Sequence, residues 1–145
     1  MQIPQPPQPT PRRLLAIDPG TNRTGIAVSD ELGLLAHPRE ALRGNAMDLI
    51  ARVIELVNAD SIDEVIVGLP VTMAGGDSSQ TRDVRAFVVA LRGALPIPVS
   101  EWDERLSSVE AAGRGLKSRD RASGRQDSAA AAIILQAVLD SRRSR

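Results

Sequence analysis

Four acidic side chains stand where predicted strands or helices begin or end, and they are the residues best suited to metal chemistry. Asp18 ends the first apolar run of the chain. Asp103 and Glu104 end a later run, and Asp127 precedes an alanine-rich helix. Clustered carboxylates repel one another, at a cost of about 4 kcal/mol for two charges ~4 Å apart at an effective dielectric near 20. Such a cluster either raises its pKa values or binds hard divalent cations such as Mg²⁺ or Mn²⁺.

Each of these acids also has an ordinary structural explanation. Asp18 could hydrogen-bond the amides of the turn that follows it. Asp103 and Glu104 could pair with Arg105 at the surface, and Asp127 could cap its helix. The spacing leaves both interpretations open, although four acids at element ends favour a shared site. Two ions held there would suit in-line displacement at phosphorus.

The elements that must position the acids are short apolar runs and stretches of helical spacing. Strands are predicted over residues 14–18, 25–28, 34–42, 65–70 and 99–102, and helices over residues 46–57, 84–91 and 129–139. The first three strands follow one another as hairpins. The later strands alternate with helices, so they should be parallel to each other. The pattern predicts an α/β fold, in which a mixed sheet carries helices on both faces.

This topology would bring the acids to one rim of the sheet. If the strand before Asp18 runs parallel to the strand before Asp103, their carboxyl ends meet at the same edge. Ligands of open α/β sheets bind outside the carboxyl ends of strands. A helix that starts at Asp127 could add its carboxylate there.

Three local signals refine the predicted elements. Asn45 is a good N-cap for the first helix, and Asp77 with Gln80 could form a capping pair for the second. Pro38 suits an edge strand, because it has no N–H to donate to a neighbouring strand.

The composition fits one domain. The chain has 145 residues, no cysteine and a formal net charge of zero. Thiolate sites and disulfides are excluded, and no overall field attracts nucleic acid or membrane. No apolar run approaches the ~20 residues of a membrane span, so a cytoplasmic location is expected. We predict a disordered Pro-rich tail over residues 1–12, a folded domain over 13–140 and a charged tail over 141–145.

A basic segment precedes Asp127. Its positive residues are Arg114, Lys117, Arg119, Arg121 and Arg125. The segment could be a solvated loop or could hold phosphates, for which arginine is well suited. Arg105 is a further candidate for phosphate contact.

Four motifs resemble the YqgF/RuvX family of Holliday-junction-resolvase-like nucleases, over about residues 14–139. The third motif is the most specific, and all four occur in order. They are Ile17-Asp18-Pro19-Gly20-Thr21 with Gly25-Ile26-Ala27-Val28-Ser29; Val67-Gly68-Leu69-Pro70 with Met73 and Gly75; Asp103-Glu104-Arg105-Leu106-Ser107-Ser108-Val109-Glu110-Ala111; and Asp127-Ser128-Ala129-Ala130 leading into Ile133 and Leu135.

The resemblance implies an RNase H-like fold with a five-stranded sheet and a metal-dependent endonuclease of structured nucleic acid. The role inferred for the family in bacteria is maturation of the 5′ end of pre-16S ribosomal RNA, which implies ribosome precursors as partners. A role in DNA repair on branched DNA is also proposed. Asp18, Glu104 or Asp103, and Asp127 would be the catalytic acids, and Asp18, Glu104 and Asp127 would hold two Mg²⁺ or Mn²⁺ ions. Most RNase H-like nucleases carry an acid on the fourth strand, where this chain has Val67-Gly68-Leu69-Pro70.

Two other classes compete with the nuclease. The Asp-x-Gly-Thr turn resembles the first phosphate loop of actin-like ATPases, but those need two such domains. A catalytically silent module that binds ribosomal RNA or the transcription machinery would fit the zero net charge. Symmetrical cleavage of a four-way junction would require a dimer, and the sequence has no clear interface signal, so a monomer and a homodimer both stay open.

Overall fold

The computed structural model describes residues 3, 12–72, 74–107 and 128–143. Five strands form one sheet in the order β3-β2-β1-β4-β5. Strands β1 (Leu14–Pro19), β2 (Thr24–Ser29) and β3 (Ala36–Leu42) pair antiparallel as successive hairpins. Strands β4 (Glu64–Leu69) and β5 (Val99–Asp103) run parallel to β1. The predicted five-stranded mixed sheet is therefore confirmed.

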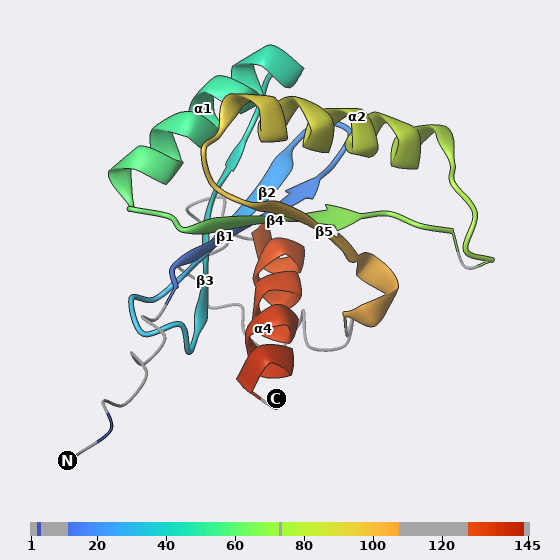
Figure 1. Cartoon of the computed structure of the whole chain (residues 1–145). Helices are drawn as coiled ribbons and strands as arrows, with labels where there is room; N and C mark the ends of the chain where they lie inside the picture. Colours follow the sequence, from blue (N-terminus) through green and yellow to red (C-terminus); the bar gives the residue numbers. More distant parts are fainter. Residues whose placement is uncertain (1–2, 4–11, 73, 108–127, 144–145) are drawn as a thin grey trace.

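Helices cover both faces of this sheet, as predicted. Helices α1 (Ala46–Ala59) and α2 (Ser79–Ala94) connect the parallel strands and lie on one face (Figure 1). Helix α4 (Ala129–Arg143) lies on the other. A short 3₁₀ turn, η1 (Glu104–Leu106), follows β5 directly. Among the described residues, no helix has the length and apolar character needed to cross a bilayer.

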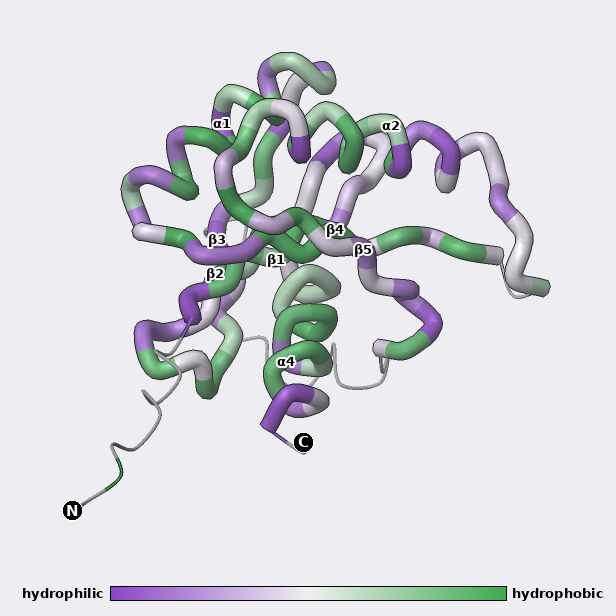
Figure 2. The backbone as a smooth tube through the Cα atoms, in the orientation of Figure 1, coloured by the Kyte–Doolittle hydropathy of each residue, from purple (hydrophilic) through white to green (hydrophobic). Residues whose placement is uncertain are grey.

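Each face of the sheet has its own apolar core. The α1 and α2 side buries Leu15 and Ile17 of β1, whereas the α4 side buries Leu14 and Ala16. This alternation is the period-2 pattern of a strand that is covered on both faces. In Figure 2, α4 is hydrophobic along most of its length and hydrophilic at its C-terminal end. The alternation fixes which face each later side chain of β1 must take.

The hairpin strands show two local effects of single side chains. Pro38 lies on β3, which is an edge strand, as expected. Strand β3 begins at Ala36 and not at Leu34, because the Asp30 carboxylate accepts the N–H groups of Leu34 and Leu35 at 2.9 and 3.0 Å. These bonds hold both residues in the turn.

The N-termini of the two connecting helices are capped in different ways. Asn45 caps α1 through a capping box with Asp48, as expected. The predicted Asp77–Gln80 pair is wrong for α2. Ser78 is the N-cap, and its hydroxyl and the Thr81 side chain bond each other's backbone N–H groups.

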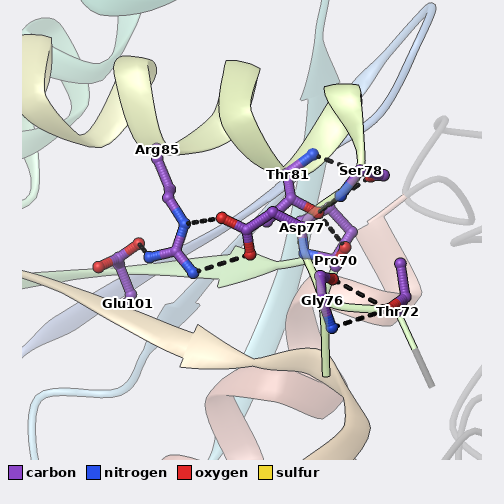
Figure 3. Close-up of polar contacts among 8 residues, drawn as sticks. All are labelled: Pro70, Thr72, Gly76, Asp77, Ser78, Thr81, Arg85 and Glu101. Carbon is purple, nitrogen blue, oxygen red and sulfur yellow. Dashed lines mark hydrogen bonds and ion pairs between the residues drawn. The ribbon is translucent and has the colours of Figure 1, made fainter. Parts of the chain in front are cut away.

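Asp77 instead fixes the loop before α2 to the edge of the sheet. Its carboxylate accepts two hydrogen bonds from Arg85, at 3.0 and 3.2 Å. The same guanidinium reaches Glu101 of β5 at 3.4 Å (Figure 3). The Thr81 hydroxyl donates to the carbonyl oxygen of Pro70 at 2.6 Å, so the chain is tied down on both sides of the loop.

The end of α4 is attached to the start of β4 by an ion pair. Arg142 donates two hydrogen bonds to the Glu64 carboxylate, at 3.0 and 2.7 Å. The Glu64 side chain is 6% exposed. These hydrogen bonds hold the pKa of Glu64 below its usual range, against the opposing effect of burial. The pair therefore stabilises α4 on the sheet while Glu64 is ionised.

We expect Glu64→Gln to lower the free energy of unfolding by about 1–3 kcal/mol at neutral pH, since a charge-assisted pair is lost. Because the pKa of Glu64 is depressed in the folded state, the stability it contributes is complete above the unfolded-state pKa of Glu. It is lost as the pH falls through the lower folded-state value. The free energies of unfolding of wild type and variant in urea should therefore differ at neutral pH and converge in acid.

The control is Glu55→Gln, which breaks an exposed ion pair and should cost less than ~0.5 kcal/mol. Equal losses would contradict this interpretation.

Candidate active site

Asp18 lies near the carboxyl end of β1 on the face that α4 covers. Leu14 and Ala16 point into the α4 core, and Asp18 is the next residue of the same parity. Its side chain is half-buried. The turn that follows needs glycine, because a Cβ on Gly20 would come within 2.4 Å of the Arg23 carbonyl oxygen. Asp18 thus stands on a rigid strand beside a narrow turn.

Glu104 reaches the same place from η1. Its side chain lies over Gly68 of β4, where an added Cβ would stand 2.9 Å from Glu104 Oε1. The Glu104 carboxyl is hydrogen-bonded to Asp18. The structure therefore brings together two of the four predicted acids, and it places the Glu104 carboxyl above the carboxyl end of the fourth strand, which has no acid of its own.

The close approach of these acids changes the protonation of Glu104. Burial, the hydrogen bond to Asp18 and the negative charges of Asp18 and Asp103 together raise the pKa of Glu104 to about 8. A raised pKa favours the neutral form of the Glu104 carboxyl. The two carboxyl groups offer hard oxygen ligands of the kind that a divalent cation prefers.

Asp103 faces a different set of partners, although it is the neighbour of Glu104 in the sequence. Its carboxylate accepts hydrogen bonds from the Arg105 backbone N–H at 2.9 Å and from the Arg105 guanidinium at 2.6–3.0 Å. The Arg105 hydrogen bonds hold the pKa of Asp103 below its usual range. Asp103 has the same strand parity as Glu101, which meets Arg85 of α2. Asp103 therefore lies apart from the pair, and only its charge reaches Glu104.

Arg105 is exposed beside this rim, but Asp103 already engages it. A Cβ on Gly75 would lie 3.7 Å from Arg105 Nη1, so the β4–α2 loop passes next to the guanidinium. The predicted phosphate contact of Arg105 stays a prediction.

The remaining predicted site residues lie outside the described residues. These are Asp127, Arg114, Lys117, Arg119, Arg121 and Arg125. Among the residues that the structure does describe, no three His, Asp or Glu side chains come close enough to hold a metal ion. The metal and basic-segment predictions are therefore untested by the geometry.

Ser128 follows Asp127 and fixes the start of α4 to the sheet. Its hydroxyl oxygen accepts the N–H of Ile26 at 2.9 Å, and its side chain is fully buried. This amide lies where the register between β2 and β3 shifts. Ile26 is the neighbour of Gly25, which pairs with Asp18. Helix α4 therefore begins close to the Asp18 end of β1.

Sequence reasoning missed three contributors to the site. Gly68 makes room for Glu104, and glycine inside a strand is a signal of close approach that could have been used. Arg23 and Arg43 line a hollow of about 560 Å³ together with Asp18. No local pattern in the sequence connects these two arginines, because they lie in separate turns.

Gly68→Ala should displace the ends of the Glu104 and Ile134 side chains, and Ile134 is buried with little room to move. The new Cβ would meet Ile134 Cδ1 at 2.7 Å and Glu104 Oε1 at 2.9 Å. We expect a loss of about 1–3 kcal/mol in the free energy of unfolding. Gly93→Ala is the matched control, because no atom lies within 4 Å of its added Cβ. That variant should be unchanged or gain up to ~1 kcal/mol as a helical alanine. An unharmed Gly68→Ala would mean that Glu104 does not lie over the strand.

Ser128→Ala should leave the Ile26 amide without its acceptor. We expect a loss of about 1–3 kcal/mol, since a buried donor becomes unsatisfied. Hydrogen exchange at the Ile26 amide should accelerate more than at other amides of β2. Ser141→Ala removes a hydroxyl that bonds only within α4, to the Val138 carbonyl, and should cost ~0.5 kcal/mol or less. Unchanged exchange at Ile26 would refute the anchoring role of Ser128.

The fold is similar to that of solved RuvC structures. It aligns with the RuvC structure from Thermus thermophilus at a TM-score of 0.61 and 18% identity, over 91% of this chain and 96% of that chain. The T. thermophilus RuvC complex with a Holliday junction substrate gives a TM-score of 0.59 and 20% identity over the same shares. RuvC has an RNase H-like fold, so the predicted fold is confirmed.

The sequence itself is similar to curated bacterial proteins that are provisionally named pre-16S rRNA nucleases. The relative from Thermobifida fusca is 41% identical in an alignment of length 140 that covers 89% of this chain and 87% of the relative. The relative from Koribacter versatilis is 39% identical in an alignment of length 135 that covers 90% of this chain and 88% of the relative. The family described as RuvX, Holliday junction resolvase, matches residues 12–141. The prediction of a nuclease is confirmed at the level of the family, and this chain belongs to the RuvX family.

Proposed function

We propose that this chain is a metal-dependent endonuclease that hydrolyses phosphodiester bonds in structured nucleic acid. The observation that carries the proposal is the pair of carboxyl groups on Asp18 and Glu104. They meet at the carboxyl ends of β1 and β5, where open α/β sheets bind ligands. Family membership supports the same chemistry.

Asp18, Glu104 and Asp127 would hold the divalent ions. The first two bring their hard carboxyl oxygens together at the end of the sheet. Asp127 is assigned to this ligand set because of its place in the family motif. The buried hydrogen bond of Ser128 supports the assignment, since it holds the start of α4 next to β2. When bound, Mg²⁺ or Mn²⁺ would activate a water for attack on the phosphate and stabilise the leaving 3′ oxygen.

The other residues at the rim would position the substrate. Gly20 keeps the turn after Asp18 narrow, which leaves the carboxylate approachable from the hollow beside it. Arg105 is held by Asp103 beside the pair and could place its remaining N–H groups on a flanking phosphate. Such contacts orient the backbone without reading its sequence.

The two substrates that fit are the 5′ end of pre-16S ribosomal RNA and branched DNA. The names of relatives at 39–41% identity support the RNA. The family description and the junction complex of T. thermophilus RuvC support the DNA. Both substrates would be met in the cytoplasm, in ribosome precursors or at repair intermediates.

Asp18→Asn and Glu104→Gln should each lower the cleavage rate at least ~10²-fold, the scale for loss of one preorganised charged group. The assay uses a labelled structured RNA with a 5′ extension and a four-way DNA junction, each with Mg²⁺, with Mn²⁺ and with chelator. Asp103→Asn should lower the cleavage rate less than Glu104→Gln does, because the Asp103 side chain contacts Arg105 and not Asp18.

Asp140→Asn is the matched control, since it makes the same chemical change on α4 beside Arg143. It should cleave as the wild type does. Cleavage that survives Asp18→Asn, or that continues in chelator, would sink the proposed site. Binding of either substrate with no cleavage at all would favour a catalytically silent module.

A further inference from the structure

A second hollow adjoins the one at Asp18. The first hollow is lined by Arg23 and Arg43, and both arginines also line a larger hollow of about 640 Å³. The larger hollow lies between β3 and α1, and its wall includes Arg39 of β3 and Arg52 of α1. The two hollows are therefore neighbours that share Arg23 and Arg43, and the smaller one reaches Asp18.

The charge of the larger hollow is unbalanced. The larger hollow is lined by Arg23, Arg39, Arg43 and Arg52 against two acids, Glu40 and Glu55. We call these four arginines the β3–α1 arginine set. In a chain whose formal net charge is zero, they give this hollow an excess of positive charge, and a hollow concentrates such a field more than a convex face does.

Two members of the set, Arg43 and Arg52, have little of their charge engaged in ion pairs. Arg52 meets Glu55 at 3.6 Å, with side chains that are 61% and 71% exposed, and an exposed pair of this kind contributes little. Arg39 meets Asp60 at 3.2 Å, and this pair is more buried. Arg43 is exposed, and within the described part of the chain no ion pair to it is formed.

We propose that the β3–α1 arginine set binds the phosphodiester backbone of the nucleic acid arm that extends from the cleavage site. The proposal rests on the proposed function for the position of the scissile phosphate at Asp18. It adds a binding surface that consists only of described residues.

The spacing of the set fits a backbone. Arg39 and Arg43 are four residues apart, about 13 Å along an extended strand. One strand of a B-form duplex presents about four phosphates over that length, at 3.4 Å of axis per phosphate. Arginine also forks onto phosphate oxygens with two N–H groups. Because these contacts involve phosphates and not base edges, the surface would serve RNA and DNA arms without sequence preference.

The test compares the wild type with the double variant Arg43→Gln/Arg52→Gln. Arg39 is kept, because its loss would leave the buried Asp60 carboxylate without its positive partner. Arg143→Gln is the matched control, since Arg143 is an exposed arginine at the far end of α4. Thermal unfolding verifies that all three proteins are folded. Binding of a labelled hairpin RNA and a four-way DNA junction is then measured by anisotropy in chelator, over a series of salt concentrations.

The double variant should reduce the magnitude of the slope of log K against log salt by about 1.4–1.8, since each of the two lost phosphate contacts contributes about 0.7–0.9. The control should keep the wild-type slope. Comparing the slopes for the hairpin RNA and for the DNA junction shows which backbone the surface prefers. A double variant with the wild-type slope on both nucleic acids overturns the proposal, even if the protein cleaves. A lowered slope without any metal-dependent cleavage would uphold the surface while the proposed nuclease activity fails.

Discussion

The contact between Asp18 and Glu104 is the constraint around which the rest of this site is built. Two carboxyl groups in a half-buried place cannot both be charged cheaply, because water does not screen them fully. The raised pKa of Glu104, about 8, expresses that cost. Glu104 avoids the repulsion when it is protonated, but burying both carboxyl groups still has a cost, so other interactions of the sheet and of α4 must offset it. A divalent cation would remove the repulsion at its source, which explains why a nuclease keeps such an arrangement.

Those offsetting interactions are spread over elements that are distant in the sequence. Gly68 leaves the space that the Glu104 side chain fills. The buried hydroxyl of Ser128 holds one end of α4 to β2, and Arg142 holds the other end to Glu64. With both ends fixed, α4 cannot move away from the face on which the two acids meet.

Strand parity explains what the sequence could predict and what it could not. Apolar runs and helical spacing predicted the elements, their order and the mixed sheet, because burial on both faces leaves a strong pattern. They also placed Asp18 and the Asp103-Glu104 pair at one rim. They could not choose between Asp103 and Glu104, since that depends on the turn of η1 after the strand ends. The prediction that Asp77 and Gln80 cap α2 was wrong for a related reason. Asp77 is hydrogen-bonded to Arg85, eight residues further along, and a capping pattern considers only residues close to the helix start.

The distribution of arginine shows why overall charge is a poor guide to partners. A chain with 18 basic and 18 acidic side chains has no net field at a distance. At close range the positive and negative charges are unevenly distributed. The acids lie at the end of β5, whereas the arginines lie along β3 and α1. Because this attraction acts only at close range, it favours a nucleic acid whose shape fits the hollow. A nucleic acid of arbitrary shape gains less from it. Selectivity for structured substrates can then arise from where the charge lies, without any contact to a base.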